Sequence, residues 1–162
     1  MPNTKKLYLS IAVFLTVLLF QADAEAVFSI QLNYFSVDFG NMDMGVIKDD
    51  VPPDGLVVTC TTDQNNAWSL MIRNDFPLTH VSNPASLIPN TNFRWYGIST
   101  SVPSNTSLVL TREDFTYEKT IYSGTAGEVA SGTDITMKFE LSLPPLLQSG
   151  VYSTNIVFTF IE

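Results

Sequence analysis

The sequence predicts an all-β protein, built as a single antiparallel β-sandwich. Three observations support this: apolar residues recur at every second position, these segments are rich in Val, Ile, Thr, Phe and Tyr, and Pro, Gly, Asn and Ser gather between them. Strands at short spacing between such turns are typical of a sandwich. The sequence shows neither helical periodicity, nor an internal repeat, nor a linker that would divide it.

Eight extended segments are expected after the N-terminal region. In chain order they are residues 27–40, 55–62, 67–74, 93–100, 107–111, 115–123, 134–143 and 151–162. The first has a one-residue slip in its alternation at Tyr34 and Phe35, which suggests a bulge or a strand that changes sheets. The stretches between the segments, including residues 49–54 and 75–92, are expected to form turns and loops.

The first 26 residues have the pattern of a secretory signal peptide. Two lysines precede an apolar run over residues 7–20, and Ala24 and Ala26 fit an A-x-A cleavage site. A transmembrane helix needs about 20 residues, and this run is shorter. An uncleaved N-terminal anchor is the alternative interpretation. We expect cleavage after Ala26 and one β-sandwich domain over residues 27–162, exported and released or held at the cell surface by non-covalent contacts.

Composition argues against some partners. The chain has 8 Lys+Arg and 16 Asp+Glu, and its net charge of −8 would repel the phosphates of a nucleic acid. Loss of residues 1–26 would remove two basic and two acidic residues and leave the net charge unchanged. No second apolar run reaches the length of a membrane span. We therefore expect no nucleic-acid partner, and no membrane contact after signal cleavage.

The titratable residues form no recognisable catalytic or metal motif. The chain has one histidine, His80, and one cysteine, Cys60, which leaves little for a zinc site. Neither a G-x-S-x-G elbow nor a Gly-rich phosphate loop occurs. Glu113 and Asp114 are adjacent, so in a strand they would point to opposite faces. We expect a protein that is not an enzyme and has no cofactor or metal; a secreted hydrolase that uses His80 with a serine or Cys60 is the least favoured alternative.

Three polar features have both a functional and a structural interpretation. Asp49, Asp50 and Asp54 could bind calcium weakly, but a solvated turn is favoured. Cys60 is expected to be a buried strand residue and not a partner in an intermolecular disulfide. The tripeptide that begins at Asn105 matches a glycosylation acceptor, which is meaningful only in a eukaryotic secretory pathway and otherwise indicates a polar loop.

The two tryptophans have different interpretations. Trp68 and Leu70 share one face of a strand, and they are expected in the core rather than on a ligand platform. In residues 93–100, Arg94, Trp95 and Tyr96 could form a surface contact patch. That patch is the basis of an alternative function, an extracellular glycan-binding β-sandwich module. Exposed aromatic rings would favour this alternative, and burial would favour simple packing.

Both ends of the predicted domain are strands. Neither residues 27–35 nor residues 155–162 contain the inward charge or proline that protects a sheet edge. Two outcomes are open. The terminal strands pair with each other or with interior strands and close the sandwich, which is favoured for the isolated chain; alternatively, the N-terminal strand adds to the sheet of a neighbouring subunit and the protein self-associates.

Three stretches resemble the bacterial WxL surface domain: "VDFGNMDMG" at residues 37–45, Trp68-Ser69-Leu70, and the closing "GVYSTNIVFTF", in which phenylalanines replace the family's tryptophan and leucine. The glycine–tyrosine closing strand is also similar to fimbrial and spore-coat-U-like pilin subunits. The resemblance implies an immunoglobulin-like or pilin-like sandwich with a structural core motif of Trp68, Leu70, Tyr152, Ile156 and Phe158. It further implies a structural or adhesive cell-surface protein that contacts the envelope or partner proteins. The departures in the second motif put the family's peptidoglycan binding in doubt.

Overall fold

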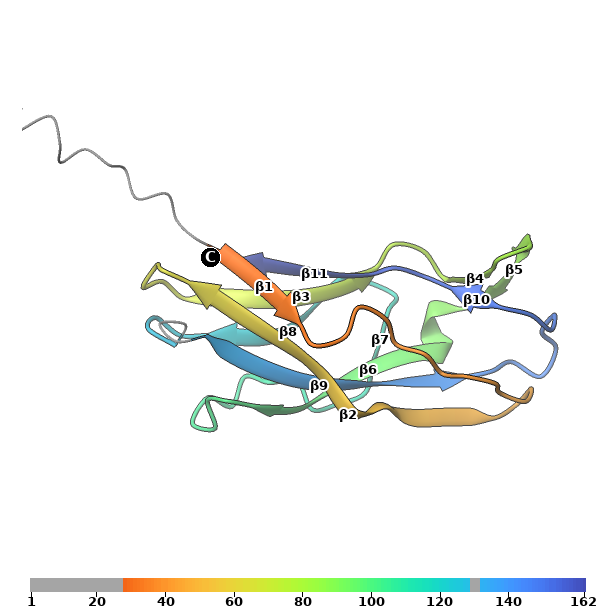
Figure 1. Cartoon of the computed structure of the whole chain (residues 1–162), viewed down its shortest axis with the longest axis horizontal. Coiled ribbons are helices and arrows are strands. Elements are labelled where there is room, and N and C mark those ends of the chain that lie inside the picture. The colour runs from red at the N-terminus through yellow and green to blue at the C-terminus, as the bar shows by residue number, and fades with distance from the viewer. Residues whose placement is uncertain (1–27, 129–131) are drawn as a thin grey trace, which may run out of the picture.

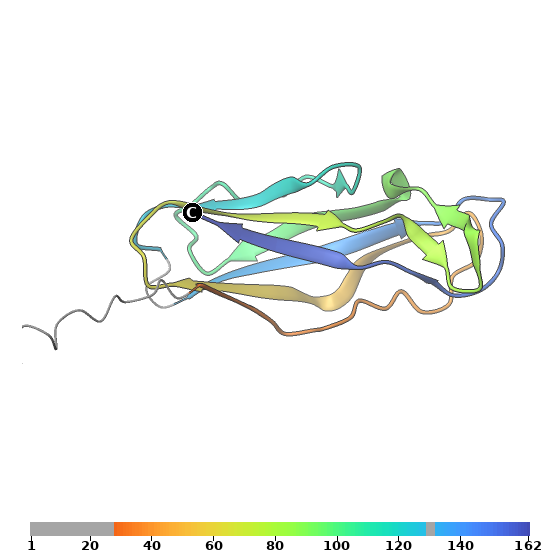
Figure 2. The ribbon, with the colours of Figure 1, turned by 90° about the horizontal axis from the view of Figure 1, so that it is seen from above.

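The computed structural model describes residues 28–128 and 132–162, so the predicted signal peptide lies outside the described part. Figure 1 shows an elongated sandwich of antiparallel sheets, which confirms the predicted all-β class. A five-stranded sheet with the order β1-β2-β9-β6-β7 packs on a three-stranded sheet with the order β11-β3-β8. A further three-stranded sheet, β10-β4-β5, continues the second layer away from the termini (Figure 2).

The strands are β1 (Phe28–Leu32), β2 (Ile47–Thr62), β3 (Trp68–Asn74), β4 (Leu78–His80), β5 (Asn83–Ile88), β6 (Phe93–Thr100), β7 (Glu113–Asp114), β8 (Lys119–Gly124), β9 (Thr133–Ser142), β10 (Tyr152–Ser153) and β11 (Ile156–Ile161). One turn of 3-10 helix, η2 (Asn90–Asn92), precedes β6. Within the described ranges, no helix has the length and apolar character needed to span a bilayer.

The core lies between the two layers and follows the alternation in the sequence. In β3 every second residue is buried, beginning with Trp68, and β9 alternates in the same way up to Phe139. The rings of Phe93 and Phe115 stack at 4.5 Å, and Phe139 packs in parallel beside them. Period-two burial of large apolar side chains on facing strands therefore holds the layers together.

Several expected boundaries were wrong. The first strand ends at Leu32 instead of continuing to residue 40, and residues 33–46 form no strand. β2 begins at Ile47 and runs through residues 49–54, where a turn was expected; its register against β9 shifts twice there. Prolines are tolerated in a strand at such irregularities. β4 and β5 lie at residues 75–92, where a loop was expected. Proline, serine and asparagine interrupt the alternation of apolar and polar residues there, so the sequence pattern did not indicate strands.

Candidate functional site: an open edge between β1 and β11

One side of the sandwich is closed by backbone hydrogen bonds. Residues 107–111, which were expected to form a strand, form none, but they lie there between β6 and β8. The N–H of Gly97 donates to the carbonyl of Val109 at 2.8 Å, and the N–H of Val109 donates to the carbonyl of Ile121 at 3.0 Å. A Cβ added at Gly97 would lie 2.6 Å from Leu108 Cδ1, so glycine permits this close approach. The segment thereby joins the edges of the two layers.

The opposite side is open. β1 and β11 are the outermost strands of their sheets: β1 pairs only with β2, and β11 pairs only with β3. In the part of the chain that the structure describes, no backbone hydrogen bond joins β1 to β11. They meet through side chains, as where the rings of Phe28 and Phe160 lie 5.8 Å apart. Figure 1 shows the two strands side by side at this edge.

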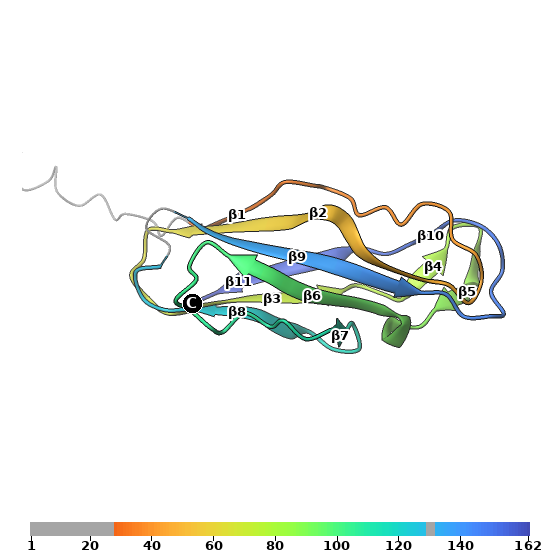
Figure 3. The ribbon, with the colours of Figure 1, turned by 90° about the horizontal axis from the view of Figure 1, so that it is seen from below.

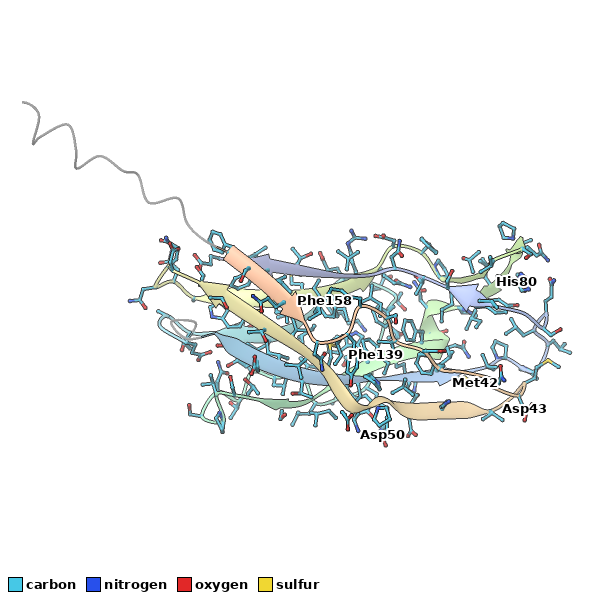
Figure 4. All side chains as sticks on the ribbon, viewed as in Figure 1. Met42, Asp43, Asp50, His80, Phe139 and Phe158 are labelled. Atoms are coloured by element: carbon cyan, nitrogen blue, oxygen red, sulfur yellow. The ribbon has the colours of Figure 1, made fainter. Side chains whose placement is uncertain are left out.

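A hollow of about 650 Å³ lies between these two strands. Its lining contains no charged side chain and includes Phe158 of β11, which is labelled in Figure 4. Phe35 is 96% exposed at its rim, which is unusual for a large aromatic side chain. The lining residues are Ile30, Gln31, Leu32, Phe35, Ile156, Val157 and Phe158. The hollow is therefore lined by the kind of side chains that form a hydrophobic core, but it remains open to solvent.

The strand order explains why the hollow exists. An immunoglobulin constant-type sandwich has sheets A-B-E-D and C-F-G. Here β1, β2, β9 and β6 take the places of A, B, E and D, while β3 and β11 take the places of C and F. No described strand lies beside β11 where strand G would complete the second sheet. Among the described residues, the outer edge of β11 therefore presents backbone N–H and C=O groups that no strand pairs with.

The predicted structural core motif divides into two parts. Trp68 and Leu70 are buried, at 3% and 0% exposure. Tyr152, Ile156 and Phe158 are only partly buried, and Ile156 and Phe158 line the hollow. Sequence reasoning placed these two residues in the core motif and their strand at a possible sheet edge, but it did not predict that they line a hollow there. The alternation of a closing strand shows which face is apolar, but not whether a neighbouring strand is present.

The predicted contact patch is corrected by the structure. Trp95 is fully buried and Tyr96 is 8% exposed, so neither ring forms an exposed platform. The Tyr96 hydroxyl donates to Asp50 Oδ1 at 2.6 Å, and the Arg112 guanidinium lies 4.8 Å from the ring centroid. Burial, with this hydrogen bond to Asp50, raises the pKa of Tyr96 to about 12. Of the three residues, only Arg94 has an exposed side chain, at 47%.

A charged network surrounds this position on the outer face of the five-stranded sheet. Glu140, whose side chain is 10% exposed, accepts from Arg112 Nε at 2.7 Å and lies 3.5 Å from Arg94 Nη1. The Tyr96 hydroxyl, with the nearby charge of Lys138, lowers the pKa of Asp50. Figure 4 shows Asp50 on the opposite edge from His80.

The same network engages two of the three aspartates considered for calcium. Asp49 pairs with Arg112, and Asp50 pairs with Tyr96 and Lys138. In the described ranges, no group of three or more histidine, cysteine or acidic side chains could hold a metal ion.

The structure does not bring His80 and Cys60 together. His80 lies in β4, and its Nδ1 accepts from the backbone N–H groups of Ser82 and Asn83 at 3.0 and 3.1 Å. Cys60 lies in β2 opposite Ile30, is fully buried, and has its pKa raised by burial to about 12. A thiol held in its protonated form is a poor nucleophile. The two residues expected for a hydrolase therefore have separate structural positions.

The side chain of Asn105, the candidate glycosylation acceptor, forms hydrogen bonds within the fold. Its amide donates to the carbonyl of Ser123 at 2.9 Å and to Glu128 Oε1 at 2.8 Å. Burial opposes ionisation of Glu128, but hydrogen bonds from Thr125, Tyr122 and Asn105 outweigh it and lower the pKa of this carboxyl. The Asn105 amide thus serves to fix a loop.

No family model matches the chain, and no curated protein matches it. The open edge is therefore interpreted from its own geometry.

Proposed function

We propose that this protein is an exported, non-enzymatic assembly or adhesive subunit of the bacterial envelope, and that it receives an extended strand from another polypeptide at the β11 edge. The single observation that supports this best is the asymmetry of the sandwich. Residues 107–111 close one side, whereas an apolar hollow without backbone pairing lies between β1 and β11 on the other.

An added β-strand fits both features of this edge. Its backbone would pair with the free N–H and C=O groups of β11, and every second side chain would enter the hollow. Apolar side chains are required there, because none of the residues that line the hollow is charged. The donor is therefore an extended segment with apolar residues at alternate positions and polar residues facing solvent.

The N-terminal strand of the same molecule does not fill the site. β1 pairs with β2 over five residues, from Phe28 opposite Thr62 to Leu32 opposite Val58. Each terminal strand pairs with an interior strand, β1 with β2 and β11 with β3, but these pairings do not close the sandwich between β1 and β11, although closure was expected for the isolated chain. The vacant pairing position lies beyond β11, so completion of the second sheet needs a strand from outside the described fold.

A peptide with the sequence of residues 27–35 is a suitable probe, since it is uncharged and alternates at Phe28, Ile30 and Leu32. Labelled peptide is added to the mature protein, and fluorescence anisotropy measures binding. Hydrogen–deuterium exchange then locates it. We expect saturable binding and new protection of β11 amides that face away from β3, because these gain partners only when a strand is added there.

Two controls make the result specific. The peptide with Ile30→Asp should not bind, because it would place a charge in the apolar hollow. The protein variant Phe35→Asp should fold, since Phe35 is 96% exposed, but should lose peptide binding. Absence of binding by the unmodified pair, or protection confined to β2 through replacement of β1, would contradict the proposal.

A further inference from the structure

A second surface lies at the end of the sandwich away from the termini. This distal end consists of residues 44–47, 81–87 and 143–151, which come together from three parts of the chain (Figures 1 and 3). The N–H of Gly45 donates to the carbonyl of Leu143, and the N–H of Leu143 donates to the carbonyl of Val46. The N–H of Val81 donates to the carbonyl of Val151 at 2.9 Å. The three segments therefore form one connected surface.

The distal end concentrates exposed aliphatic side chains. Of the fifteen exposed large hydrophobic residues in the described chain, seven lie here, and Leu146 is 94% exposed. They are Met44, Val46, Ile47, Val81, Leu87, Leu146 and Val151. Single exposed apolar residues are normal on a protein surface, but several on adjoining segments mark an interaction surface.

The surface also lacks charge. Residues 76–93 and 141–161 contain no Asp, Glu, Lys or Arg, although the whole chain carries a net charge of −8. Asp43 and Lys48, which have opposite charges, border the segment 44–47. The ion pairs of the described residues lie elsewhere, for example where Arg112 and Arg94 meet Glu140 on the outer face of the five-stranded sheet.

We propose that the distal end is a self-association surface, at which two copies of this chain meet. Copies with a net charge of −8 repel one another, so a contact between them is opposed least at a surface that carries no charge of its own. The distal end satisfies this condition and supplies apolar area for water to be released on contact. A two-fold arrangement would place Leu146 of each copy against the same aliphatic cluster of the other.

Salt provides a characteristic test. Because the contact is apolar and the remaining surfaces repel, added NaCl should screen the repulsion and strengthen association of the mature protein. Sedimentation equilibrium at 0.05 and 0.5 M NaCl measures this effect. An association held by ion pairs would instead weaken at the higher salt concentration, which would overturn the proposal.

Three single substitutions at exposed residues separate this surface from the strand-acceptor edge. Leu146→Asp should weaken self-association at least tenfold and leave peptide binding at β11 unchanged. Phe35→Asp should have the opposite pattern. Leu110→Asp is the matched control, since Leu110 is 64% exposed outside the distal end, and it should change neither property.

The outcomes are distinct. A mature protein that stays monomeric at millimolar concentration, or a Leu146→Asp variant that associates like the unmodified protein, would overturn this inference without affecting the strand-acceptor proposal. Monomeric protein that instead sediments with vesicles of zwitterionic phosphatidylcholine would assign the surface to lipid and would also overturn it.

Discussion

The indole of Trp68 packs directly on the backbone of Gly124, its pairing partner in β8. A Cβ added at Gly124 would lie 2.0 Å from Cε2 of the indole, a separation that side chains cannot adopt. The same indole contacts Tyr122 and Phe160, at 5.3 and 5.1 Å between ring centroids. The glycine thus makes room for the largest side chain of β3, which in turn supports β11 at the open edge.

Replacing Trp68 with alanine should lower the free energy of unfolding by about 3–5 kcal/mol, as large aromatic truncations in cores do. Urea denaturation measures this. Trp68→Phe should cost much less, because in the described structure the indole Nε1 has no hydrogen-bond partner to lose. Tyr117→Ala is the control, since Tyr117 is 75% exposed and should change stability by less than about 0.5 kcal/mol. Equal stability of Trp68→Ala and the unmodified protein would show that the indole is not a core residue.

Gly124→Ala should also destabilise the fold, by about 1–3 kcal/mol, because the new methyl group overlaps the indole. The double variant with Trp68→Phe should recover part of this loss, since the smaller ring leaves space for the methyl group. Thermal denaturation of the four proteins gives the coupling energy. Strictly additive effects would mean that the contact between these two residues is unimportant.

Removing the cation and removing the anion of the network around Glu140 should lower the free energy of unfolding by different amounts. Arg112→Ala removes the closest partner of a carboxylate that is 10% exposed, and should cost about 1–3 kcal/mol because a buried charge loses its hydrogen bond. Glu140→Gln leaves Arg94 and Arg112, both 47% exposed, in contact with water, and should cost less than about 1 kcal/mol. Urea denaturation of both variants decides the order; a larger loss for Glu140→Gln would contradict this explanation.

Alkaline pH should destabilise the protein through Cys60. Burial raises the pKa of this thiol from 9.0 to about 12. Above about pH 9 the unfolded chain loses the thiol proton while the folded chain keeps it, so the free energy of unfolding falls as pH rises toward about 12. Urea denaturation between pH 8 and 11 should show a shallower fall for Cys60→Ala. In the native state the thiol should resist aromatic disulfide reagents at pH 8 and react only in urea.

Export makes a separate prediction that concerns residues outside the described structure. Protein isolated from the native host should begin at Val27, because cleavage is expected after Ala26. Intact-mass measurement tests this. A chain that still begins at Met1 and is extracted only by detergent would favour the anchor alternative.

The sequence by itself determined the fold class and much of the core. Alternation placed Trp68 and Leu70 on the inward face of one strand, because a strand sends successive side chains to opposite sides. It could not determine which faces remain covered. From their residue types, Trp95 and Tyr96 could have formed a contact patch. In the folded chain both are buried, and the hydroxyl of Tyr96 is engaged by Asp50.

Tertiary structure alone decided where the open surfaces lie. Ile156 and Phe158 have the same pattern as residues in a covered strand, but their exposure depends on whether a strand pairs beyond β11, a relation between segments distant in sequence. The distal end likewise combines residues near positions 45, 81 and 146 through hydrogen bonds that no local pattern encodes. Local periodicity sets the orientation of each side chain, whereas the neighbours of a sheet edge follow from the path of the whole chain.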